Sequence, residues 1–345
     1  MKRKENIDLL KAIAITMILI YHGICYNINY QSKNIYEGIF TASIPLFFLI
    51  NGYLLFSKDF NLKKHTYKII RLTLLTIIWG IITTLLILII KNQQITFEII
   101  FNILWKLKYG YVNHLWFMGS LICIYIFFPL FKSTFDNNKK AFIWTLVLCF
   151  LFVFGNKFIN MSVTLYRYYF KNIKSISNIN YFSVFNPYNG LKGYTIFYFL
   201  LGGLIKIYEE HIRKTKIMIP ITGIIISIIG LYSYRLVYSD ITGKIYDIVW
   251  NGFDTLMSLI ITVSLYRLCI NYNFKSKIIT YISKNTFGIY LIHMLYIHLT
   301  IDYIKEIPFF CSAIGNIVYG IYILILSSIT IIIIKKIPII KKLLQ

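Results

Sequence analysis

The chain has 345 residues, of which 58% are apolar and only 14% are charged, whereas an ordinary soluble domain has about 25% charged residues. These values argue against a soluble fold, and because about 20 apolar residues cross a bilayer, the composition provides for about ten crossings. The formal net charge of +23 would suggest nucleic acid in a soluble protein. In a membrane protein the same excess usually marks cytoplasmic loops, so we expect a lipid bilayer and no nucleic acid as partner.

Hydropathy predicts ten membrane-spanning helices. Met1–Lys4 and the apolar run that follows resemble a signal peptide, but no small-residue cleavage site follows the run, so we expect a retained first helix. The spans are predicted near residues 10–29, 38–56, 69–90, 114–131, 141–158, 194–208, 217–236, 250–270, 285–303 and 310–334. Lipid offers no partner to an unpaired backbone, so every span is expected to be α-helical. No repeat or linker divides the chain, which predicts one all-α polytopic membrane domain over residues 1–345.

The distribution of basic residues predicts that both termini are cytoplasmic. With the N-terminus inside, 23 of the 36 Lys and Arg residues fall in predicted cytoplasmic segments and 12 in outer ones. Lys11 lies within the first helix. This bias follows the positive-inside rule and indicates a multi-pass protein of the cytoplasmic membrane.

The cysteines indicate neither a disulfide framework nor a metal site. The five cysteines lie in or beside apolar runs, with no CxxC pair and no spacing typical of metal ligands. We therefore expect no metal and no permanently bound cofactor.

The first helix carries Lys11 and His22, which are costly inside a membrane. Eleven residues correspond to about 16 Å of rise and bring the two side chains within about 20° of one face. If Lys11 reaches the cytoplasmic surface, His22 lies near the middle of the membrane. His22 is either a general base in a buried cavity or a neutral histidine bonded to another helix.

Two further sites carry polar residues. Lys68 and Arg71 open the third span on adjacent positions of one face, where they either bind phosphates or are ordinary flanking charges. His293 lies deep in the ninth span, and His298, five residues later, is expected on another face with a structural role.

In five short motifs the chain resembles the acyltransferase 3 family, whose members are integral membrane acyltransferases that modify sugars and surface polymers. The motifs follow the family's order: Lys11 and His22 with ten residues between them, Phe47–Tyr53 (FFLINGY), Lys68–Arg71 (KIIR), His114–Phe117 (HLWF) and Ile289–His293 (IYLIH). Three positions depart from the family pattern: Lys stands for Arg at Lys11 and Lys68, and Asn51 stands for Ser. Lys keeps the charge of Arg but lacks its planar fork.

The resemblance implies an O-acetyltransferase that moves an acyl group, chiefly acetyl, from a cytoplasmic acyl-CoA to a glycan hydroxyl. It implies that the coenzyme phosphates lie near Lys11, Lys68 and Arg71, and that His22 acts as general base or as transient acyl acceptor. The cavity or acceptor side would include Asn51, Tyr53, His114, Trp116, Tyr290 and His293. The acceptor would be an extracytoplasmic surface or capsular polysaccharide or its lipid-linked precursor, reached directly or through a separate extracytoplasmic transferase.

The longest predicted outer connection, residues 157–193, contains the run Tyr166–Lys171 (YRYYFK). Aromatic rings with interleaved cations suit an acidic glycan, but an interfacial aromatic belt has the same composition. A glycan transporter or flippase is the rival function. Peptidoglycan, a glycolipid or an antibiotic sugar remain alternative acceptors, and succinyl an alternative acyl group.

Overall fold

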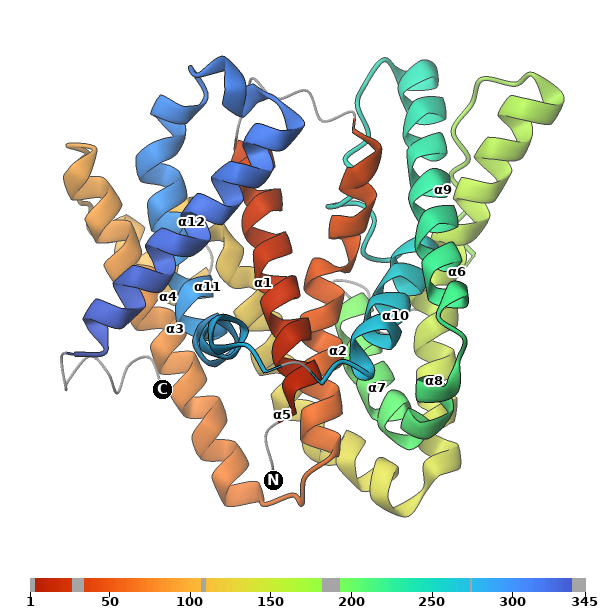
Figure 1. Ribbon diagram of the computed structural model, residues 1–345, viewed down its shortest axis with the longest axis horizontal. Helices are drawn as coiled ribbons and strands as arrows, with labels where there is room; N and C mark the ends of the chain where they lie inside the picture. Colours follow the sequence, from red (N-terminus) through yellow and green to blue (C-terminus); the bar gives the residue numbers. More distant parts are fainter. Residues whose placement is uncertain (1–3, 27–33, 107–109, 182–192, 274, 337–345) are drawn as a thin grey trace. The chain divides into compact units, whose positions relative to one another are not determined.

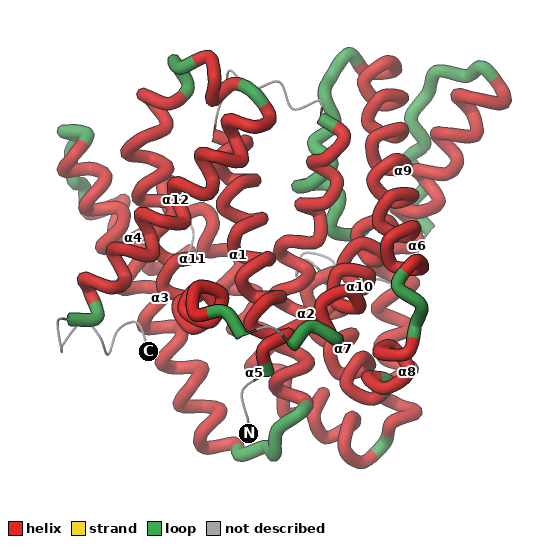
Figure 2. Tube along the Cα trace, in the orientation of Figure 1, coloured by secondary structure: helices red, strands yellow, loops and turns green. Residues whose placement is uncertain are grey.

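The computed structural model describes residues 4–26, 34–106, 110–181, 193–273 and 275–336, and within these ranges the chain is helical with no strand (Figures 1 and 2). The α-helices are α1 (Glu5–Tyr26), α2 (Ser43–Phe56), α3 (Leu62–Ile90), α4 (Phe97–Lys106), α5 (Trp116–Asn137), α6 (Lys139–Lys171), α7 (Tyr194–Ile207), α8 (Glu209–Lys214), α9 (Met218–Thr242), α10 (Leu256–Ile270), α11 (Lys277–Ile304) and α12 (Ala313–Ile334). Three short 3-10 helices lie between them: η1 (Ile35–Ala42), η2 (Gly110–Leu115) and η3 (Pro308–Cys311). The all-α prediction is confirmed for the described residues.

Eight of the described helical segments are long and apolar enough to cross a membrane. They are Glu5–Cys25, Ile35–Phe56, Leu62–Ile90, Gly110–Asn137, Lys139–Lys171, Met218–Thr242, Lys277–Ile304 and Ala313–Ile334. Each overlaps one predicted span. The other two predicted spans, near 194–208 and 250–270, coincide with the shorter apolar helices α7 and α10, so the count of ten and the side of the termini stay predictions.

Polar side chains determine where several helices begin. Each accepts a hydrogen bond from a backbone N–H three residues later, which satisfies one of the donors that a helix start leaves unpaired. The capping residues are Asn61 for α3, Asn138 for α6, Thr255 for α10, Ser276 for α11 and Ser312 for α12. These caps mark the first residue of each helix, whereas hydropathy alone gives only an approximate start.

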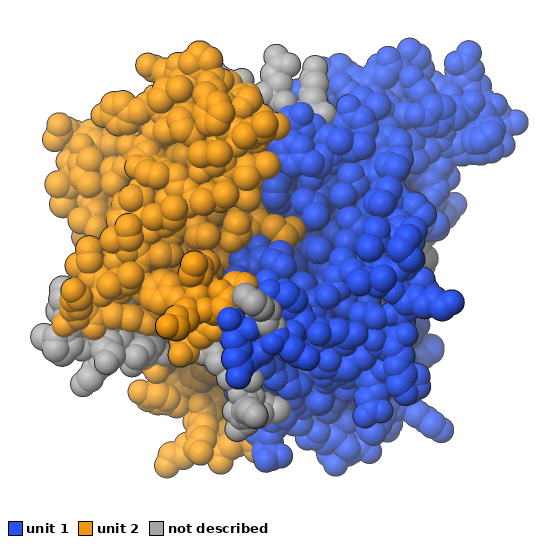
Figure 3. Space-filling model, in the orientation of Figure 1, with its two compact units in different colours: residues 1–14, 32–59, 130–275 blue, residues 15–31, 60–129, 276–345 orange. Residues whose placement is uncertain are grey.

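The chain forms two compact units, shown in separate colours in Figure 3. Unit 1 comprises residues 1–14, 32–59 and 130–275, and unit 2 comprises residues 15–31, 60–129 and 276–345. Helices α1 and α5 each begin in one unit and end in the other. The division is not marked by any Gly- or Pro-rich linker in the sequence.

In unit 1, α2 and α7 pack closely because each has a glycine where the other's backbone passes. A Cβ on Gly52 would lie 1.9 Å from the carbonyl oxygen of Phe199, and one on Gly202 would lie 2.2 Å from the carbonyl oxygen of Leu49. Small residues allow this approach between membrane helices. The glycine of the FFLINGY motif thus has a packing role.

In unit 2, α11 contacts both α12 and α3. A glycine again permits a close crossing: a Cβ on Gly320 of α12 would lie 2.6 Å from the Cα of Ile20 on α1. This crossing places the last turns of α1, which include His22, in the unit that also holds α11.

Helix α6 corrects one prediction. The sequence predicts a span ending near residue 158 and a connection after it, but α6 continues to Lys171. Asn, Ser, Arg and Tyr residues in its last turns lower the hydropathy without preventing helix formation. The helix ends at Asn172, whose φ of 54° lies in the left-handed region that Asn tolerates.

Candidate active site

His22 and His293 form a direct contact in unit 2. The Nδ1 atom of His22 lies 2.8 Å from the Nε2 atom of His293, and the two rings are nearly parallel, at 11°. His293 is fully buried and His22 is partly exposed. The sequence raised the possibility that His22 bonds to another helix, and the structure shows such a contact. The partner, His293, is itself a candidate site residue.

The hydrogen-bond chain indicates which bonded ring nitrogens donate and which one accepts. The Nδ1 atom of His293 lies 2.5 Å from the Tyr290 carbonyl oxygen, and because a carbonyl only accepts, this nitrogen must donate. With both rings neutral, the Nε2 atom of His293 then accepts from the Nδ1–H of His22. The Nε2 atom of His22 is left with its lone pair, which is the form that a general base or nucleophile requires.

His114 completes a cluster of three histidines. Its ring centroid lies 5.1 Å from that of His293 and 5.3 Å from that of Tyr290. Tyr290 donates its hydroxyl hydrogen to the His114 backbone carbonyl, which fixes η2 against α11. The His114 side chain is buried, yet neither ring nitrogen has a hydrogen-bond partner among the described residues. Buried polar atoms without partners are rare and costly, so His114 offers hydrogen-bonding capacity to a bound molecule.

Phe117 and Tyr111 extend the surroundings of the histidine cluster of His22, His114 and His293. Trp116 begins α5, and the next residue, Phe117, packs its ring 5.3 Å from that of Tyr290. The His298 ring lies edge-on to Tyr111 of η2 at 4.9 Å. The structure thus brings His22, His114, Tyr290 and His293 together, and the place of Trp116 at the site stays a prediction.

The predicted cations lie inside the N-terminal halves of two helices. Lys11 is the seventh residue of α1, and Lys68 and Arg71 are the seventh and tenth residues of α3. The Lys68 ammonium lies 3.3 Å from the Tyr125 hydroxyl and 4.5 Å from the centre of its ring. A cation over an aromatic face is held electrostatically, so Tyr125 orients Lys68 in unit 2.

Comparison with known proteins decides the family. A model of the acyltransferase domain matches residues 4–336, which is nearly the whole chain. The chain belongs to the acyltransferase 3 family. Neither the curated proteins nor the solved structures gave a significant match. The family and the eight long apolar helices together identify a multi-pass membrane acyltransferase.

In this acyltransferase, Asn51 and Tyr53 lie in unit 1, and both form hydrogen bonds within that unit. The Asn51 side-chain amide donates to the Phe47 carbonyl of its own helix at 2.8 Å. The Tyr53 hydroxyl donates to Glu209 Oε2 at 2.7 Å and accepts from Lys4. Both were predicted on the cavity or acceptor side, and that assignment stays a prediction.

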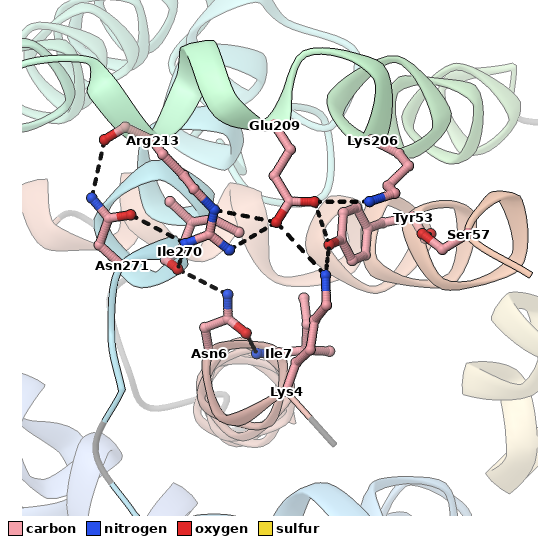
Figure 4. Close-up of polar contacts among 10 residues, drawn as sticks. All are labelled: Lys4, Asn6, Ile7, Tyr53, Ser57, Lys206, Glu209, Arg213, Ile270 and Asn271. Carbon is pink, nitrogen blue, oxygen red and sulfur yellow. Dashed lines mark hydrogen bonds and ion pairs between the residues drawn. The ribbon is translucent and has the colours of Figure 1, made fainter. Parts of the chain in front are cut away.

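Glu209 is the centre of a polar cluster that sequence reasoning missed (Figure 4). Its carboxylate accepts from Tyr53, from Lys206 at 3.2 Å and from Arg213 at 2.7 Å, and Lys4 lies 3.6 Å away. Partial burial would raise the pKa of Glu209, but the hydrogen bonds from Arg213, Tyr53 and Lys206 outweigh this effect and lower the pKa to about 2.

The Glu209 cluster joins five helices of unit 1. Arg213 also donates to the Ile270 carbonyl at 2.7 Å, and the Asn6 side chain donates to the same oxygen at 2.9 Å. The cluster thereby ties together the start of α1, the ends of α2, α7 and α10, and α8. Glu209 lies in a short segment that contains several other charged residues. No local pattern in the sequence distinguished it from them as the centre of a cluster.

The acyltransferase presents no group of three or more His, Cys, Asp or Glu side chains able to hold a metal ion within the residues that the structure describes. The described cysteines are all free thiols.

Proposed function

We propose that the chain is a membrane O-acetyltransferase that moves an acetyl group from cytoplasmic acetyl-CoA to a hydroxyl of an extracytoplasmic surface or capsular polysaccharide, or of its lipid-linked precursor. The family supplies the reaction class. The observation that carries the proposal is the chain from the Tyr290 carbonyl through His293 to His22, because it leaves His22 Nε2 as an available base. The enzyme would lie in the cytoplasmic membrane with its termini inside.

In direct transfer, His22 Nε2 takes the proton of the acceptor hydroxyl as its oxygen attacks the thioester carbonyl. The carbon–sulfur bond breaks, and the proton passes from His22 to the departing coenzyme thiolate. The imidazolium formed in between keeps its Nδ1–H bonded to His293. In the relay alternative, His22 Nε2 itself attacks the thioester carbonyl, the carbon–sulfur bond breaks, and coenzyme A leaves as the thiolate. The acceptor hydroxyl oxygen then attacks the acetyl carbon, the bond from that carbon to Nε2 breaks, and the hydroxyl proton passes to Nε2 and on to the thiolate.

The continuous helix α1 supports the proposed placement of the donor. Lys11 and His22 lie on one uninterrupted helix, so their eleven-residue separation does correspond to about 16 Å of rise. That span is comparable to an extended pantetheine arm. We assign the coenzyme phosphates to Lys11, Lys68 and Arg71, and the thioester to His22.

For the acceptor we assign His114 as the group that binds the hydroxyl-bearing sugar. Its two buried nitrogens provide one donor and one acceptor in the neutral ring. Gly110–Asn137 is a candidate span, and His114 lies near its first residue, on the side that the charge rule predicts to be extracytoplasmic. An acceptor from outside would therefore meet His114 first.

The test compares His22→Ala with His211→Ala, a matched histidine variant on the exposed surface of α8. Membranes containing each protein receive acetyl-CoA labelled in the acetyl group together with the surface glycan. We expect His22→Ala to lose transfer by a factor of about 10³ or more, with membrane insertion unchanged and His211→Ala active. Normal transfer by His22→Ala would refute the mechanism, and glycan export without acetyl incorporation would indicate the transporter instead.

A further inference from the structure

We propose that the end of α6 is a docking surface for an anionic glycan. This surface, termed the α6 arm, consists of residues 156–181: the last turns of α6 and the segment that returns beside them (Figures 1 and 2). The inference rests on the proposed function for its orientation and for the chemical class of the acceptor. It adds to the proposed function a site at which the enzyme binds a polymeric acceptor.

The arm must lie outside the hydrocarbon of the membrane. Residues 172–181 form no helix and most are exposed, and lipid does not accommodate exposed irregular backbone. This segment returns as far as Asn156, because the Asn156 amide donates to the Asn180 side chain at 3.1 Å. Residues 139–155 remain to cross the membrane, about 25 Å of helix, and residues 156–171 extend about 24 Å beyond it. Since α6 is the fifth candidate span, its end lies opposite the N-terminus.

Hydrogen bonds hold the arm in one conformation. Asn160 accepts from the Ile179 N–H at 2.6 Å and from the Ser177 hydroxyl at 2.9 Å, and it donates to the Ile179 carbonyl at 2.7 Å. The Thr164 hydroxyl accepts from the Ser177 N–H at 2.9 Å. A surface ordered before binding loses less entropy when a ligand docks.

Two contacts anchor the arm to the end of α9. Asp240 accepts from the Tyr168 hydroxyl at 3.0 Å and pairs with Lys174 at 2.9 Å. Tyr168 thus points toward α9. At about 100° per residue, Tyr166 and Phe170 lie on the side of the helix opposite Tyr168. Tyr169 lies at the edge of that side, about 100° from Tyr168, and its ring meets the Tyr168 ring edge-on with centroids 5.1 Å apart.

This opposite side presents an aromatic face. The exposed fractions are 51% for Tyr166, 60% for Tyr169 and 77% for Phe170. The rings of Tyr166 and Phe170 are stacked with centroids 5.6 Å apart. Exposed, ordered rings are suited to stacking against the apolar faces of sugar rings, and outside the hydrocarbon they have no lipid tails to contact.

Charge beside the aromatic face favours an anionic ligand. Residues 156–181 include four basic residues and no Asp or Glu. Lys157 and Lys174 pair with Asp254 and Asp240. Arg167 and Lys171, which follow the aromatic face around the helix, form no ion pair with any other residue that the structure describes. An acidic sugar chain would place carboxylates or phosphates against these two cations.

The experiment measures binding of two soluble polysaccharides to the full-length protein in nanodiscs of zwitterionic lipid, without acetyl-CoA. Polygalacturonate is the anionic probe and dextran is the neutral one. The variants are Tyr169→Ser/Phe170→Ser and Arg167→Gln/Lys171→Gln. Lys139→Gln/Lys140→Gln at the other end of α6 and Phe97→Ser, an exposed ring on α4, are the matched controls.

We expect the wild type to prefer polygalacturonate, and each arm variant to raise its Kd about tenfold or more while the controls leave it unchanged. Higher salt should weaken binding by the wild type more than by Arg167→Gln/Lys171→Gln. No binding by the wild type, equal binding of dextran, or unchanged affinity in folded arm variants would overturn the proposal. So would arm variants that lose affinity only for anionic lipid vesicles, which would identify the arm as a membrane contact.

Acetyl transfer is measured separately, so the two proposals fail in different ways. A protein that binds polygalacturonate through the arm but transfers no acetyl group would contradict the proposed function alone. If the arm variants acetylate glycans as well as the wild type does and bind them with the same affinity, only the docking surface would be contradicted.

Discussion

The Glu209 cluster of unit 1 and the histidine cluster of unit 2 differ in how many of their hydrogen bonds are made. In unit 1, both carboxylate oxygens of Glu209 are bonded, and Arg213 also donates to the Ile270 carbonyl. In unit 2, His22 and His293 are joined, but His114 keeps two buried nitrogens without partners among the described residues.

The difference separates a structural cluster from a reactive one. A carboxylate whose two oxygens are both bonded stabilises the fold. A cluster that buries unbonded nitrogens costs free energy, and such local violations are expected at functional sites. We therefore expect changes at Glu209 to affect stability, and changes among the histidines to affect catalysis.

Among the variants that keep His22, the largest expected effect is the loss of catalysis in His293→Ala. Removing the acceptor of the His22 Nδ1–H frees His22 to rotate and to take the wrong tautomer, so kcat should fall by about 10²- to 10³-fold. The thermal unfolding midpoint in detergent should change little by comparison.

The matched variant for this test is His293→Gln, whose side-chain oxygen still accepts a hydrogen bond. It should recover part of the lost kcat. Equal losses in His293→Ala and His293→Gln would mean that His293 acts through packing rather than through its bond to His22.

The next largest effect is a loss of stability in Glu209→Ala. This change leaves Lys4, Lys206 and Arg213 without their shared carboxylate, and the free energy of unfolding should fall by about 2 to 3 kcal/mol. Acetyl transfer per folded molecule should stay the same. Unfolding in detergent measures the first quantity, and transfer normalised to folded protein measures the second.

Glu210→Ala is the control, because Glu210 neighbours Glu209 but is exposed. It should have little effect on unfolding. If Glu209→Ala removed activity from a protein of unchanged stability, the division between a structural and a reactive cluster would be wrong.

A smaller effect follows from pH. The folded pKa of Glu209, about 2, lies below the unfolded value of about 4.3. The carboxylate therefore contributes stability that is fully present above about pH 5 and is lost as pH falls toward 2. Unfolding midpoints between pH 6 and pH 2.5 should decline more steeply for the wild type than for Glu209→Gln, and parallel curves would contradict the assignment.

The sequence predicted helices and motifs better than it predicted contacts. Apolar run length gave the eight long helices, and the spacing of Lys11 and His22 required only a regular helix. The pairing of His22 with His293 joins residues 271 positions apart, which no local pattern encodes. Lys4 was counted only as a flanking charge, because nothing near it in the sequence indicates Glu209 as partner.

Hydropathy and motif position each leave part of the structure undetermined. Hydropathy measures the preference of a segment for lipid, so it marked the apolar run that ends near residue 158 and did not show that the same helix continues to Lys171. Motif position assigned Asn51 a site role, which stays a prediction, without showing where its amide points. The structure gives that amide a bond to the Phe47 carbonyl.

The smallest expected effect is that of His114→Phe, which should keep or raise stability and weaken binding of the acceptor. Phenylalanine fills nearly the same space without the two unbonded nitrogens, so the free energy of unfolding should stay equal or rise by up to about 1 kcal/mol. The KM for the acceptor should rise about tenfold, because the sugar loses its hydrogen bonds, while the KM for acetyl-CoA stays unchanged. Steady-state kinetics with each substrate varied in turn measures both constants. If His114→Phe were less stable and its KM for the acceptor were unchanged, His114 would have a structural role rather than a role in binding the acceptor.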